Sequence, residues 1–307
     1  MTPDSLPFEF PFQWDNESLR EGAGVTPEAA AILKQRDRDL EDFLAGSAGV
    51  PTILVAASDA SDRTKAIAHY LCDGADDAEQ INAALAECST LGFGRVLLSE
   101  GNFAITNGVG DLPANVALQG LGKTVTKLNH SGVSANSVFI GSTSSGTGAS
   151  ISDMTLDATG ILDGGYGLVL GGDRTRVERV RMVGLGRQNY ANIDFTGAYG
   201  VFRDCDFISP GVAGAAGISL GGAHCRVIDN YFYTIPDAAV RGAFSTPAFT
   251  VVMGNDIEWS QSGNAGTASI IVGTNAIVVG NICQDNRGSP ATITSGAGSQ
   301  VANNVLR

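Results

Sequence analysis

The sequence contains few of the residues that build metal and redox sites. It has five cysteines and three histidines in 307 residues, with no CxxC pair. The cysteines are Cys72, Cys88, Cys205, Cys225 and Cys283. Metal sites need ligands clustered at short spacings, so we expect no metal site and no cofactor. An odd number of irregularly spaced cysteines also favours free thiols and synthesis in a reducing cytoplasm.

The chain also lacks long apolar runs and an excess of basic residues. No stretch of 18 consecutive apolar residues occurs, so no membrane-spanning helix is expected. The N-terminus, which starts with Met1 to Asp4, has no basic region followed by an apolar run, so a secretion signal is not expected. The 32 acidic and 19 basic residues give a net charge of −13. This charge repels phosphates and excludes nucleic acid as a partner.

Glycine is abundant, with 40 residues, which indicates many tight bends between ordered segments. A six-residue unit with apolar first and last positions recurs, beginning at residues 151, 177, 202, 227, 252, 278 and 301. A propeller would need about 40 residues per blade, and the long helix-period stretches of a helical solenoid are missing. We therefore predict an all-β protein, a single-stranded right-handed parallel β-helix whose coils stack about 4.8 Å apart.

The fourth position of this unit changes along the chain from apolar residues to asparagine. Its occupants are Met154, Val180, Cys205, Asn230, Asn255, Asn281 and Asn304. Stacked amides can donate hydrogen bonds to one another along the axis. The single register of the four asparagines therefore predicts an inward ladder, because ordinary turn asparagines would scatter. Cys205 and Cys283 also fall at inward positions, where cysteine acts as a small apolar side chain.

Two regions precede the β-helix. Residues 1–25 hold Phe8, Phe10, Phe12 and Trp14, and such exposed aromatics favour an arm that docks on a partner. Residues 26–46 have the pattern of one helix with an a/d spacing of apolar residues over barely two heptads. A short helical neck that joins copies of the chain and a single helix packed on the following domain both fit this pattern.

Residues 51–128 are predicted to form the N-terminal cap and first coils, and residues 129–307 the regular coils. Asp76 is placed to cap a helix that continues through Ile81 and Leu85 and stops at Gly92. Short strands are expected on both sides of this helix.

The run from Asp73 to Leu85, DGADDAEQINAAL, and the run from Gly94 to Phe103, GRVLLSEGNF, carry a family resemblance. They resemble the opening of the pectate-lyase-like right-handed β-helix superfamily, in the form found on bacteriophage tail proteins and tailspikes. Ser99 stands where proline is usual, and Phe93 replaces a glycine. The resemblance implies that the helix caps the first coil.

The charged helix after Trp14 is similar to the virion-facing segment of tail proteins from phages of actinobacteria. This similarity implies that the chain forms a homotrimer and is part of the virion. Residues 1–46 would dock on other tail or baseplate proteins, and the β-helix would face a polysaccharide of the host surface.

Carboxylates and aromatics gather at outward positions of three successive units. Asp206 and Asp256 lie two coils apart, about 9.6 Å if stacking is regular, and could serve as the acid and base of an inverting glycoside hydrolase. The candidate ligand-binding residues are Tyr231, Asp204, Asp229, Glu258 and Trp259. Outward aspartates also serve solubility, which is the stronger interpretation. The motifs of polygalacturonase-like hydrolases and of pectate lyases are not evident.

The leading hypothesis is a tailspike-like structural and receptor-binding protein of a phage tail, with no firm sign of an enzyme. The alternative is a polysaccharide depolymerase, a hydrolase or lyase, on the same β-helix. A cytosolic carbohydrate epimerase of the β-helix type is disfavoured because it leaves the arm and neck unexplained.

Overall fold

The computed structural model describes residues 50–130, 138–141, 145–159, 166–184, 191–208, 216–233, 239–242, 249–259, 268–285 and 292–307. Val50–Arg307 forms one compact unit, and Met1–Gly49 is a separate unit. The predicted arm over residues 1–25 and the predicted neck over residues 26–46 both lie outside the described residues.

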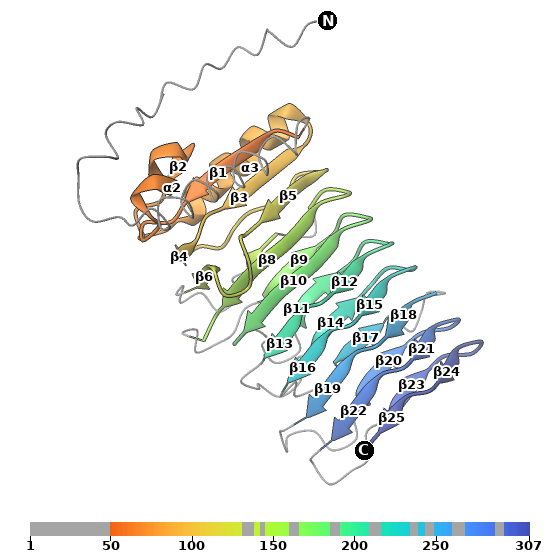
Figure 1. Cartoon of the computed structure of the whole chain (residues 1–307). Helices are drawn as coiled ribbons and strands as arrows, with labels where there is room; N and C mark the ends of the chain where they lie inside the picture. Colours follow the sequence, from red (N-terminus) through yellow and green to blue (C-terminus); the bar gives the residue numbers. More distant parts are fainter. Residues whose placement is uncertain are drawn as a thin grey trace, which may run out of the picture. The chain divides into compact units, whose positions relative to one another are not determined.

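The described chain begins with a cap of short strands and two helices. These elements are β1 (Thr52–Ala56), α2 (Asp62–Ile67), β2 (Tyr70–Leu71), α3 (Ala78–Leu91), β3 (Gly94–Leu98), β4 (Gly101–Ile105), β5 (Val116–Gln119) and β6 (Thr126–His130). The helix α3 buries Ile81, Ala84 and Leu85 against the first coils and ends at Gly92, which adopts a φ of 79°. The capping helix expected from the sequence is therefore present (Figure 1).

The predicted N-cap of α3 is off by one residue: Asp77 occupies this position without a side-chain hydrogen bond to the helix, while the Asp76 carboxylate accepts from the backbone of Ala78 in the first turn. The carboxylate of Asp76 accepts hydrogen bonds from the Thr106 backbone and from the Asn107 side chain. Fully buried Asp77 accepts from the backbone N–H groups of Gly74 and Ala104, at 2.8 and 2.7 Å. Both aspartates thus fasten the start of α3 to strand β4 and to the turn after it.

Each later coil contributes three short strands that stack in parallel on the same strands of the coil before. One column forms a separate sheet of β7 (Val138–Ile140), β9 (Tyr166–Leu170), β11 (Ala191–Phe195), β14 (Ala216–Leu220), β17 (Val240–Gly242), β20 (Ile270–Val272) and β23 (Ile293–Ser295). The parallel pairing throughout confirms the predicted β-helix (Figure 1).

The six-residue repeat forms the other two columns, which meet at a bend. Strands β8 (Ser150–Asp157) and β10 (Arg176–Val183) run through both columns. The first column continues as β12 (Val201–Arg203), β15 (Arg226–Ile228), β18 (Val251–Met253), β21 (Ile277–Val279) and β24 (Gln300–Ala302). The second continues as β13 (Asp206–Ile208), β16 (Tyr231–Tyr233), β19 (Asp256–Trp259), β22 (Ile282–Asp285) and β25 (Val305–Leu306).

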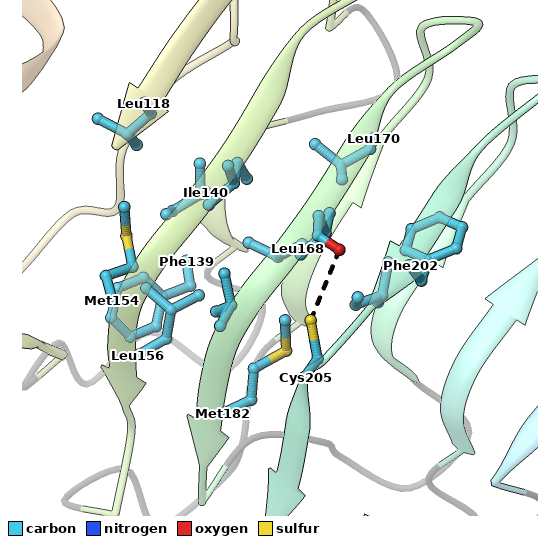
Figure 2. Close-up of a cluster of buried hydrophobic side chains, with 14 of the residues drawn as sticks. Leu118, Phe139, Ile140, Met154, Leu156, Leu168, Leu170, Met182, Phe202 and Cys205 are labelled. Atoms are coloured by element: carbon cyan, nitrogen blue, oxygen red, sulfur yellow. Dashed lines mark hydrogen bonds between the residues drawn. The ribbon is translucent and has the colours of Figure 1, made fainter. Parts of the chain in front are cut away.

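The core lies between the three columns and is filled by the apolar positions of the repeat. Figure 2 shows Met154, Leu168, Met182 and Phe202 pointing inward from different strands toward one another. Cys205 lies among them, fully buried, as its position in the repeat predicts. All five cysteines are free and buried, so they act as small apolar side chains rather than as cross-links.

The asparagine ladder is present. The side-chain amide of Asn230 donates to Oδ1 of Asn255 at 3.0 Å, and Asn255 donates to Asn281 at 2.9 Å. Asn281 donates in turn to Asn304 at 2.9 Å. Each acceptor oxygen also receives the backbone N–H of the asparagine one coil earlier. The ladder satisfies buried polar groups at the bend, where apolar residues could not.

Candidate functional site

The bend between the two columns turns its third residue outward in a left-handed backbone conformation. Asp204 and Asp229 occupy this position with φ of 54° and 55°, and Gly254 follows with φ of 67°. Aspartate and glycine tolerate this region better than most residues. The same local geometry therefore recurs on each coil and lines up the aspartates along the axis.

The strand after the bend presents its first residue to the outside. Asp206 pairs in register with Tyr231, and Tyr231 pairs with Asp256, so the three side chains form one outward column over β13, β16 and β19. The next residues inward, such as Phe207 and Phe232, are fully buried and stack at 4.5 Å. Core packing thus sets which side of the strand the column faces.

The outward aspartates of the bend and the outward column over β13, β16 and β19 together line an open groove of about 320 Å³. Its lining residues are Lys123, Asp204, Asp206, Asp229, Asn230, Tyr231, Gly254 and Asp256. The structure therefore brings together five of the residues singled out in the sequence. Glu258 adjoins the groove through a hydrogen bond from the hydroxyl of Tyr231 at 3.2 Å. Trp259 ends β19, and its side chain lies outside the described residues.

Lys123 was not anticipated from the sequence. It lies in the turn between β5 and β6, 83 residues before Asp206, and its ammonium reaches the Asp206 carboxylate at 3.0 Å. No spacing rule connects two residues so far apart in different kinds of segment, so only the stacking of coils could reveal the pair. The lysine places one positive charge at an otherwise acidic groove.

Tyr231 is the aromatic centre of this groove. Its ring stacks on that of Tyr233 with centroids 6.2 Å apart and 19° between the planes. Burial, together with the nearby carboxylate of Glu258, raises the pKa of Tyr231 to about 12. The phenol therefore stays protonated at neutral pH and donates to Glu258. The groove offers carboxylate acceptors, one ammonium donor and an aromatic surface.

Two further outward features lie on other columns. Burial raises the pKa of Asp194 on β11, while a hydrogen bond with Ser219 on β14 opposes this shift. On the bend before β12, β15 and β18, the rings of Tyr199, His224 and Phe249 stack in parallel with centroids 4.9 and 5.1 Å apart. Neither feature was anticipated from the sequence.

Within the described residues, no cluster of histidine, cysteine and acidic side chains could hold a metal ion. None of the helices in this part of the chain is both long and apolar enough to cross a membrane.

No protein-family model matches the sequence, and no curated protein matches it. Among solved structures, the A-module of the mannuronan C-5 epimerase AlgE4 of Azotobacter vinelandii is 15% identical, with a TM-score of 0.41 over 76% of this chain and 75% of that one. The surface adhesin PfbA of Streptococcus pneumoniae is 12% identical, with a TM-score of 0.45 over 76% of this chain and 77% of that one.

A tailspike protein of E. coli bacteriophage HK620, solved with a pentasaccharide, is 14% identical, with a TM-score of 0.43 over 75% of this chain. This chain spans about half, 52%, of that tailspike chain. These likenesses are remote. The strand pairing of the chain itself defines it as a parallel β-helix protein with an outward acidic and aromatic groove.

Proposed function

We propose that the chain is a tailspike-like receptor-binding protein of a bacteriophage tail, and that its groove binds a polysaccharide of the host surface. The groove over β13, β16 and β19 carries this proposal. Sugars present many hydroxyl donors around rings with an apolar face. Carboxylates such as Asp206 and Asp256 accept hydrogen bonds from hydroxyls, and the ring of Tyr231 offers a stacking surface between them.

The repetition of the groove along the axis favours a chain-like ligand over a small molecule. Outward carboxylates recur on successive coils at Asp204 and Asp229, about 4.8 Å apart. An extended polymer can contact several coils at once, whereas a compact ligand would leave part of this open groove unused.

The placement on a phage tail rests on the sequence. The motif from Asp73 to Phe103 resembles the opening of tail β-helices, and the aromatic arm and helical neck over residues 1–46 fit a segment that docks on other tail or baseplate proteins. The a/d pattern in the neck supports assembly of copies, which we propose to be a homotrimer in the virion.

Binding to an array of purified bacterial capsular and cell-wall polysaccharides tests the groove. We expect the full chain to bind at least one of them, and Tyr231→Ala to weaken that binding at least tenfold. Arg181→Gln is the matched control, because Arg181 lies in the same outward column one coil before Asp206 and does not line the groove. Absence of binding to every polysaccharide, or equal binding by Tyr231→Ala, would refute the proposed function.

A polysaccharide depolymerase is the second candidate. The observation that favours it is the pairing of Asp206 and Asp256 in one column, two coils or about 9.6 Å apart. This spacing lies just above the range of about 6.5–9.5 Å between the carboxyl groups of inverting glycosidases. Incubation with a bound polysaccharide should then shorten its chains, and Asp206→Asn and Asp256→Asn should each abolish shortening. Unchanged chain length with the wild-type protein would rule this candidate out.

A further inference from the structure

The side-chain donors that line the groove are already engaged within the protein. The ammonium of Lys123 lies 3.0 Å from the carboxylate of Asp206. The hydroxyl of Tyr231 donates to Glu258 at 3.2 Å. The side-chain amide of Asn230 is 2% exposed and donates into the asparagine ladder at 3.0 Å. A ligand in the groove therefore meets few donors that are turned toward it.

The backbone N–H groups around the groove are engaged as well. Those of Asp229, Tyr231 and Asp256 donate to carbonyls of adjacent coils at 3.0, 2.9 and 2.9 Å. This direction follows from parallel stacking, in which the main-chain hydrogen bonds join one strand to the next. Backbone sites for anions need N–H groups that point at the ligand. The main chain offers none at these three positions.

The carboxylates of the groove, in contrast, are only partly engaged. At the first groove coil, Asp206 has the ammonium described above, and Asp204 lies 3.5 Å from the guanidinium of Arg203. On the next two coils, Asp229 and Asp256 form no ion pair within the described part of the chain. The negative charge without a cation is therefore concentrated on the coils of β16 and β19.

The cations at the first groove coil do little to offset this charge. Lys123 and Arg203 pair with carboxylates of that coil, two coils or about 9.6 Å before the coil of Asp256. This separation exceeds the Debye length of about 8 Å at physiological ionic strength. Arg181 lies one coil before Asp206 and does not line the groove. An anionic ligand that spans the groove thus meets uncompensated carboxylates at its far end.

We infer that the groove selects neutral polysaccharides with free hydroxyl groups and rejects polymers of uronic acids. The inference rests on the proposed glycan binding and specifies the class of polysaccharide. An ionised carboxylate only accepts hydrogen bonds, so Asp229 and Asp256 need donors such as sugar hydroxyls. A uronate would instead place a second acceptor beside them, and the like charges repel. The net charge of −13 adds repulsion between the whole chain and any polyanion.

Paired polysaccharides on an array test this selection. Neutral galactans, glucans and mannans with free primary hydroxyls are compared with the same polymers after oxidation of these hydroxyls to carboxylates. We expect the full chain to bind at least one neutral polymer, and oxidation to weaken that binding at least tenfold. The gap should narrow in 1 M salt, where the Debye length falls to about 3 Å, because charge and not bulk causes it.

The outcomes separate this inference from the proposed function. Oxidised polymers or polygalacturonate that bind as tightly as the neutral polymers would overturn the inference while glycan binding stands. A gap that salt does not narrow would also overturn it, because the rejection would then be steric. No binding to any polysaccharide would overturn both.

Two groove variants should shift the selection in opposite directions. Asp229→Asn removes a charge with little change of shape, since asparagine tolerates the φ of 55° and keeps one acceptor. The ratio of neutral to oxidised affinity should fall at least threefold in Asp229→Asn and rise at least threefold in Lys123→Gln, which leaves Asp206 without its cation.

Asp62→Asn is the matched control for the charge change. Asp62 is exposed in the first turn of α2, and its replacement alters the net charge by the same amount as Asp229→Asn. It should leave the ratio unchanged. An equal fall in Asp62→Asn, or an unchanged ratio in both groove variants, would overturn the assignment of the selection to the groove.

Discussion

The asparagine ladder allows a quantitative prediction at Asn255, in the middle of its run. Its side chain is 1% exposed. Its oxygen accepts from the backbone N–H and the amide of Asn230, both at 3.0 Å, and its own amide donates to Asn281 at 2.9 Å and to the carbonyl of Val227 at 3.0 Å. Replacing Asn255 by valine removes all of these bonds at once.

The cost of Asn255→Val follows from the donors that it leaves unpaired. Val180 occupies the same repeat position and is fully buried, so the site accommodates a valine without a clash. The loss is therefore mainly that of two donors on Asn230, which is itself 2% exposed. Each buried unpaired donor costs about 1–3 kcal/mol, partly offset by the added apolar burial. We expect the free energy of unfolding to fall by about 3 kcal/mol, or the Tm by roughly 6–12 °C.

The comparison with Asn304→Val isolates this cause. Asn304 accepts the same two bonds from Asn281, but it is half-buried on the outermost described coil, where water can replace it. Its replacement should cost about 1 kcal/mol or less. Thermal and urea unfolding followed by far-ultraviolet circular dichroism measure both variants. Equal losses for Asn255→Val and Asn304→Val would refute the role of buried unpaired donors.

Two further predictions concern the other outward features. Because burial raises the folded-state pKa of Asp194, its negative charge opposes folding, and stability is lost as the pH rises through that pKa. Asp194→Asn should therefore raise the Tm at pH 7, and the difference between the variant and the wild type should vanish below about pH 4. An unchanged Tm at pH 7 would contradict this. His224→Ala should lower the stability by about 1–2 kcal/mol because it breaks two ring stacks. His224→Gly should cost about 1 kcal/mol less than the alanine variant, since His224 adopts a φ of 60°; chemical denaturation of both variants tests the order.

The repeat was predictable because its information is local. The apolar first and last positions of the unit, such as Val227 and Phe232, recur at intervals of 23 to 26 residues, and this short regular spacing fits a stack of equivalent coils. The inward direction of Asn230 and the outward direction of Tyr231 follow from the same alternation. Hence the sequence was sufficient to identify the ladder and the column of candidate site residues.

Other features depend on contacts between segments that are distant in the chain. The sequence pattern suggested that Asp76 caps α3, but packing against β4 gives the N-cap to Asp77 and turns Asp76 to Thr106 and Asn107. Local sequence propensity cannot predict such a contact, because the contact depends on the position of a strand about 30 residues later.

By itself, the sequence determined the coil repeat, the core positions and the register of the outward aspartates, because each of these is encoded in a six-residue unit that recurs about every 25 residues. Only the tertiary structure brought Lys123 to Asp206 across 83 residues and stacked His224 between Tyr199 and Phe249. The physical reason is that the stacking of coils brings together residues that are tens of residues apart in the chain, while the intervening chain carries no local signal of which side chains will meet.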